Sequence, residues 1–279
     1  MNEVSAWLLV TGPLVLGLAI FLVLSLASEI GYRFGSRRGA TLPVDADHSV
    51  TATLTAGMVG LLAFILGLTI NFAQSRFEAR RELVVTEANA ISTAWLRAKV
   101  VGGPEGEAIA VLIREYAQTR LDFTRARSDG PIGALSARTH AEARQIWDQV
   151  GLAARKAPTP ITATLITALT EMFDSAQSQR FAFLGEAPGA MLDMMMLGGV
   201  IAIGAMGYEA GLRGRRQPVL TSLLLLMWAG GMVMTVDLNR ARVGAIPVDI
   251  RPLEWTIQEI DEARVAPAPG APTPAGEHP

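Results

Sequence analysis

The chain has 279 residues, of which 50% are hydrophobic and only 18% are charged, and its formal net charge is −2. A soluble domain carries nearer a quarter charged residues, so this composition indicates a membrane protein. The small net charge argues against nucleic acid as a partner. The absence of cysteine excludes disulfides, thiolate metal sites and cysteine nucleophiles.

The N-terminal segment, residues 1–50, predicts a first transmembrane span followed by a loop. No residue between Glu3 and Glu29 is ionisable, and residues 7–27 are mostly apolar. A membrane-spanning helix needs about 20 such residues. A cleaved signal peptide is the alternative, but it would have a positively charged start and a shorter apolar run. We therefore expect a retained span at about 7–27.

A second span is expected at residues 51–75, within a longer helix. No side chain from Ser49 to Ser75 is ionisable, and no proline interrupts the run from Thr51 to Val100. After residue 75 the pattern changes to apolar residues spaced seven, four, three and four apart, which is typical of an amphipathic helix. The simplest prediction is one helix of about 50 residues, or about 75 Å.

Residues 76–187 predict a helical-bundle extramembrane domain. Gly102-Gly-Pro104 ends the long helix, and further helices are expected at about 108–126, at about 135–154 and from residue 161 onward. No strand pattern competes with them. The fold class is therefore all-α: a polytopic membrane protein with four transmembrane helices and this bundle inserted between the second and third spans.

The third and fourth spans are expected within residues 188–238, joined by a tight basic loop at 211–217. Residues 239–264 predict an amphipathic C-terminal segment, and the tail at 265–279, mostly Pro, Ala and Gly, is expected to be disordered. Four spans place both termini and the bundle on one side of the membrane. Arginines flank the spans at both faces, so the charge distribution leaves the orientation open.

A candidate pore lining lies in the second span. Phe64, Leu68 and Phe72 recur every four residues and so share one helix face. Repeated around a symmetry axis, that face would form an apolar constriction able to gate by dewetting. Asn71 is a polar candidate beside it. Packing against lipid or another helix is the alternative explanation.

Arg76, Arg80 and Arg81 lie at the end of the same span and are candidates for an anion-attracting mouth. Anchoring to lipid headgroups and pairing with nearby glutamates are the alternatives. Three acids are expected within or at the membrane, where a carboxylate is costly unless it has a partner or a function: Glu29, Asp193 and Asp237.

The sequence offers little for catalysis. The three histidines, at positions 48, 140 and 278, have no metal-ligand spacing, and no phosphate loop, dinucleotide fingerprint or nucleophile elbow is present. We therefore expect no metal, no cofactor and no enzymatic activity.

The long helix also carries a resemblance. Residues 61–73 (LLAFILGLTINFA) and 75–97 (SRFEARRELVVTEANAISTAWLR) resemble the signature of the bestrophin-like domain proteins of bacteria. The similarity covers roughly residues 5–260 and includes the sequence from Asp237 to Arg240 and Gly244. Asn239 stands where the family usually has a second acid, and Ala241 where it usually has proline, which puts the turn after the fourth span in doubt.

This resemblance implies an inner-membrane protein with four spans and with the bundle and both termini in the cytoplasm. True bestrophins, remote relatives of the family, are pentameric anion channels whose second span lines the pore. The resemblance therefore suggests a homo-oligomeric channel for anions or small solutes in the lipid bilayer. The alternative hypothesis is a non-conducting membrane scaffold or sensor whose cytoplasmic bundle binds a partner protein.

Overall fold

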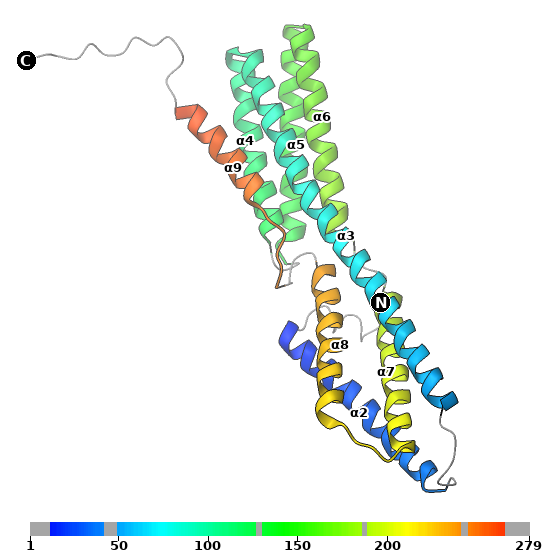
Figure 1. Cartoon of the computed structure of the whole chain (residues 1–279). Coiled ribbons are helices and arrows are strands. Elements are labelled where there is room, and N and C mark those ends of the chain that lie inside the picture. Colours follow the sequence, from blue (N-terminus) through cyan, green and yellow to red (C-terminus); the bar gives the residue numbers. More distant parts are fainter. Residues whose placement is uncertain (1–11, 42–48, 127–129, 186–188, 241–244, 266–279) are drawn as a thin grey trace, which may run out of the picture. The chain divides into compact units, whose positions relative to one another are not determined.

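The computed structural model describes residues 12–41, 49–126, 130–185, 189–240 and 245–265. The expected start of the first span before residue 12, part of the loop that follows that span, and the expected disordered tail beyond residue 265 lie outside these residues. All regular structure within them is helical: α2 (Pro13–Gly39), α3 (Ser49–Val101), α4 (Gly103–Arg125), α5 (Ile132–Lys156), α6 (Pro160–Leu184), α7 (Gly189–Leu212), α8 (Pro218–Asn239) and α9 (Arg251–Val265) (Figure 1).

Four of these helices are long and apolar enough to cross a membrane: α2, the apolar half of α3, α7 from Leu192 onward, and α8. The prediction of four candidate spans in an all-helical chain is therefore confirmed for the described residues. α3 runs without a break for 53 residues, from Ser49 to Val101, which confirms the single long helix. α2 continues beyond residue 27 to Gly39.

The chain divides into two compact units. Unit 1 comprises residues 1–79 and 183–248, and unit 2 comprises residues 80–182 and 249–279. α3 contributes its first part to unit 1 and its second part to unit 2.

Unit 1 is held together by an apolar core that all four candidate spans share. In it, side chains of α2 pack with Leu62 of α3 and with residues of α7 and α8, among them Leu16, Ile20, Leu24, Met195, Ile203, Trp228 and Met232. Most of the remaining apolar side chains of these helices stay exposed. A helix bundle with an apolar exterior is what a bilayer solvates.

Glycines bring α2 and α7 into backbone contact. A Cβ atom added to Gly31 would lie 2.0 Å from the carbonyl oxygen of Gly204, and one added to Gly35 would lie 2.0 Å from that of Tyr208. The same crowding occurs from the other side, where a Cβ on Gly207 would approach the carbonyl oxygen of Ser28 to 2.1 Å. Small residues four apart allow such close helix packing in membranes. This glycine seam of α2 and α7 lies where α2 continues as a helix beyond its apolar stretch.

Unit 2 is a bundle of α4, α5, α6, α9 and the second part of α3. Two aromatic contacts join its helices: Tyr116 of α4 meets the edge of Phe173 of α6 at 5.5 Å between ring centroids, and Trp147 of α5 lies 5.8 Å from the same ring. Burial raises the pKa of Tyr116 above its usual range, so this side chain stays neutral.

A buried polar network crosses the core of unit 2. The guanidinium of Arg120 in α4 donates hydrogen bonds to Glu87 of α3 and to Gln179 of α6, and Gln179 in turn donates to the hydroxyl of Thr124 at 3.2 Å. Burial opposes the charge on Arg120, but the adjacent carboxylate of Glu87 raises its pKa overall. The network therefore ties three helices together through one ion pair.

Within unit 2, α9 makes polar contacts with α4 and α3. Arg114 of α4 makes a bidentate ion pair with Asp261 of α9, with N–O distances of 2.9 and 2.7 Å, and Thr256 donates to the carbonyl oxygen of Ala88 at 3.4 Å. Between α3 and α4 the chain turns at two successive glycines, Gly102 and Gly103, with φ angles of 65° and 64°. Residues other than glycine rarely adopt this backbone conformation.

Candidate functional site

The candidate pore residues lie on a face of α3 that the other described residues leave largely exposed, called here the uncovered face. Phe64 is 64% exposed, Leu68 44% and Phe72 57%. Bulky apolar side chains this exposed need either lipid or another protein surface around them. The structure thus brings all three to one uncovered stripe within unit 1, as their four-residue spacing predicted.

The opposite face of α3 is the one that packs in unit 1. Thr55, Leu62, Thr69 and Ala73 are buried there, and Leu66 packs partly against the same core. Their spacings of seven, four, three and four turn them to one side of a helix. Because the packed and exposed faces are distinct, Phe64, Leu68 and Phe72 contribute nothing to the core of unit 1.

Glycines share the uncovered side of α3. Among the described residues, a Cβ atom added to Gly57, Gly60 or Gly67 would meet no atom within 4 Å apart from the adjacent backbone of its own helix. Within the described residues these glycines therefore create no close helix contact, unlike those of α2 and α7.

Polar residues continue the uncovered stripe toward the end of unit 1. Asn71 is exposed beside Phe72. Ser75 and Glu78 follow at spacings of four and three on the same helix face, where Glu78 accepts a hydrogen bond from Gln74 at 2.9 Å. The first acidic group on this face is thus two turns beyond Asn71.

The three arginines proposed as an anion-attracting mouth have different surroundings. In unit 1, Arg76 is half-buried and donates to the carbonyl oxygen of Gly185 at 2.9 Å. In unit 2, Arg80 is only 1% exposed, whereas Arg81 is exposed. Arg80 follows Ala73 by seven residues and so continues the packed face of α3. Among the described residues, the three arginines thus differ in their burial and in their contacts.

The three expected acids also differ in their partners. Glu29 of α2 pairs with Arg33 at 2.8 Å and with Arg216 at 3.5 Å. Asp193 is half-buried near the start of α7. Asp237, buried at the end of α8, accepts hydrogen bonds from the backbone N–H groups of residues 245 and 246 at 2.8 and 3.1 Å. Asp237 thus fixes the chain where it leaves α8.

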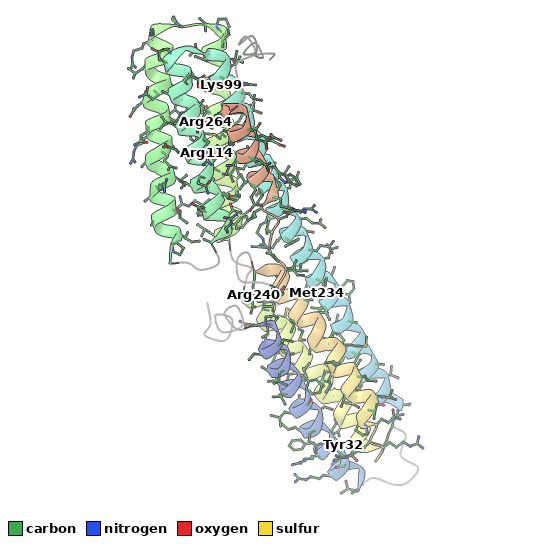
Figure 2. All side chains as sticks on the ribbon, turned by 90° about the vertical axis from the view of Figure 1, so that its left-hand side faces the viewer. Tyr32, Lys99, Arg114, Met234, Arg240 and Arg264 are labelled. Atoms are coloured by element: carbon green, nitrogen blue, oxygen red, sulfur yellow. The ribbon has the colours of Figure 1, made fainter. Side chains whose placement is uncertain are left out.

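Sequence reasoning missed two features of this part of the molecule. One is the glycine seam of α2 and α7, which the four-residue spacing of Gly31, Gly35 and Gly39 could have revealed. The other is the contact of the predicted basic loop with α2, where the guanidinium of Arg216 lies 4.0 Å from the ring centroid of Tyr32. Figure 2 shows Tyr32 on α2. Among the described residues, no three His, Asp or Glu side chains gather in a group that could hold a metal ion.

Solved structures of a bacterial bestrophin homolog from Klebsiella pneumoniae have the same fold. Three variant forms of that protein, at 14%, 17% and 15% sequence identity, superpose with TM-scores of 0.62, 0.62 and 0.61. The alignments cover 89%, 90% and 94% of this chain and 96%, 97% and 97% of the homolog. Identities this low show likeness of fold alone.

Comparison of the sequence with known proteins gives the family. None of the curated proteins matches the chain. A family model, the bestrophin-like domain, matches residues 20–253. This range includes the described parts of all four candidate spans except the first turns of α2, together with the whole of the long helix α3. With a match over most of its length, the chain is a multi-pass membrane protein that belongs to the bestrophin-like family.

Proposed function

We propose that the protein is an oligomeric channel for anions or small solutes in the inner membrane, with the uncovered face of α3 lining the pathway. The observation that carries this proposal is the exposed stripe of Phe64, Leu68 and Phe72 on a span whose other face builds the core. Bestrophins, the better-known relatives of this family, are anion channels.

The mechanism would be passive. Rings of Phe64, Leu68 and Phe72 around a symmetry axis would form an apolar neck that is impermeable when it is dry and conducts when water enters. Asn71 would offer a polar group next to the narrowest part. We further propose that residues 76–187 form a cytoplasmic bundle between the second and third spans, on the same side as both termini, so that α3 connects the bundle to the neck.

Charge selectivity depends on which charged groups reach the pathway in the assembly. An anion-attracting mouth requires Arg76, Arg80 and Arg81 to face the axis, yet in the single chain Arg80 is packed and Arg76 donates to Gly185. Glu78, by contrast, continues the uncovered stripe. We therefore expect Arg81→Gln to lower the relative chloride permeability if the arginines face the axis, and Glu78→Gln to raise it if Glu78 faces the axis. The reversal potential in a chloride gradient separates the two.

The experiment that tests the proposal is flux from vesicles. Purified protein is reconstituted into chloride-loaded vesicles, and efflux is followed with Phe72→Ala and Phe64→Ala variants. A smaller side chain in an apolar neck widens it and lowers the cost of wetting, so flux should rise. Phe34→Ala is the matched control, because Phe34 is an equally exposed phenylalanine of α2 outside the stripe.

A different outcome would favour the alternative function. If the folded protein gives no flux across a range of pH and calcium, or is a monomer by native mass spectrometry, no central pathway exists. The bundle would then be the functional domain, binding a partner protein in a membrane scaffold or sensor.

A further inference from the structure

A basic cavity lies in unit 1 where α7 and α8 are joined. It has a volume of about 490 Å³ and is formed by the second half of α2, the end of α7, the connecting residues 213–217 and the first turns of α8. Arg213, Arg215 and Arg216 line it together with the carboxylates Glu29 and Glu209. The cavity is at the end of two candidate spans, which is where lipid headgroups meet a membrane protein.

The ion pairs leave positive charge available in this cavity. Glu209 is paired with Arg213 at 2.9 Å, and Glu29 is shared between Arg33 and Arg216. The guanidinium of Arg216 stacks on the ring of Tyr32 at 4.0 Å, which holds it in place. Arg215 is exposed and has no side-chain partner among the described residues. Three arginines line the cavity against two carboxylates, and Arg33 also pairs with one of these carboxylates, so the cavity favours an anion.

An apolar groove adjoins the basic cavity. It has a volume of about 860 Å³ and runs between α8 and the first turns of α2. Its walls are almost entirely aliphatic or aromatic, with Leu14, Leu18, Phe21, Leu223 and Leu226 among them. Pro218 and Ser222 line both cavities, so the two adjoin at the start of α8.

We propose that this continuous surface is a binding site for one anionic phospholipid. The phosphate group would lie against Arg215 and Arg216, and an acyl chain would follow the groove between α2 and α8. A free anion would use only the basic cavity, and a helix of a second copy would use only the apolar groove. An amphiphile with a negative head uses both. Basic pockets between transmembrane helices recognise anionic headgroups in this way. The site does not depend on whether the protein conducts.

The test is a lipid titration of the delipidated full-length protein, followed by native mass spectrometry. Dioleoyl phosphatidylglycerol should bind with one lipid per chain, and dioleoyl phosphatidylcholine should bind much more weakly. Arg215→Gln combined with Arg216→Gln should weaken phosphatidylglycerol binding by about thirtyfold, the combined effect of two arginines near a lipid headgroup. Arg37→Gln with Arg38→Gln is the matched control, because both are exposed arginines at the end of α2 that do not line the cavity.

A second variant tests the groove without changing any charge. Gly230 lines the groove and has no atom near its Cβ position, so Gly230→Phe should fill the groove and reduce phosphatidylglycerol binding at least tenfold. Met227→Phe, at an exposed position of α8 outside the groove, should not. Equal binding of both lipids would overturn the proposal. The proposal would also be overturned if inorganic phosphate displaced the lipid completely and Gly230→Phe left lipid binding unchanged. That result would indicate a free-anion site. A Gly230→Phe variant that changes the oligomeric state but not lipid binding would assign the groove to a second copy.

Discussion

Substituting Gly35 with alanine should separate α2 from α7. The new Cβ atom would lie 2.0 Å from the carbonyl oxygen of Tyr208, whereas real Cβ contacts essentially never fall below 3.0 Å. The helices must therefore move apart by about 1 Å, the difference of these two distances. The neighbour is backbone and cannot rotate away. Overpacking of this kind costs about 1–3 kcal/mol, and we expect the upper end of that range.

The sign of this effect is informative because helix propensity acts in the opposite direction. Alanine favours a helix over glycine by about 1 kcal/mol, so an isolated α2 would be stabilised by the change. Gly230→Ala in α8 provides the matched control, since a Cβ there meets nothing within 4 Å. The thermal midpoint of the Gly230→Ala variant should stay unchanged or rise slightly.

The assay is thermal unfolding in detergent, followed by circular dichroism. A loss of about 3 kcal/mol lowers the midpoint of a chain of this size by about 6–12 °C. Gly35→Ala should show such a fall with unchanged helical content at low temperature. An unfolding curve for Gly35→Ala that coincides with the curve for Gly230→Ala would refute the packing seen between α2 and α7.

Three further predictions concern other parts of the chain. Glu87→Gln leaves the charge of Arg120 buried without its counter-ion, so we expect a loss of about 3–5 kcal/mol, measured by denaturant unfolding; a loss below that of an exposed pair, about 1 kcal/mol, would contradict it. The hydrogen bond from Arg114 lowers the pKa of Asp261 below its ordinary value. The contact therefore stabilises α9 above the ordinary pKa of about 3.9 and is lost as pH falls through the lowered pKa. Pepsin should release α9 more slowly from the wild type than from Asp261→Asn near about pH 4, and the two rates should converge as pH falls. Asp237→Asn removes a charged acceptor from two backbone N–H groups, a cost of about 1.5–3 kcal/mol, and should speed hydrogen exchange of the amides at 245 and 246; exchange as slow as in the wild type would count against this role.

The sequence by itself determined which segments are apolar and helical. Long runs without charge or proline predicted the candidate spans α2, α3, α7 and α8, because hydropathy and helix continuity are properties of the local chain. The uninterrupted course of α3 through Gln74 followed from the same reasoning. The change to an amphipathic pattern after residue 75 likewise predicted that this helix leaves the apolar span and enters the helical bundle at that point.

Tertiary structure alone decided what each side of these helices does. Phe64, Leu68 and Phe72 could have faced the core or been left uncovered, and their exposure depends on where α7 and α8 pack. Adjacent residues in a helix point about 100° apart. For that reason Arg80 is packed and Arg81 exposed although they are neighbours in the sequence. Backbone contact at Gly35, and the meeting of Tyr32 with Arg216 across 184 residues of sequence, arise only when distant segments fold together.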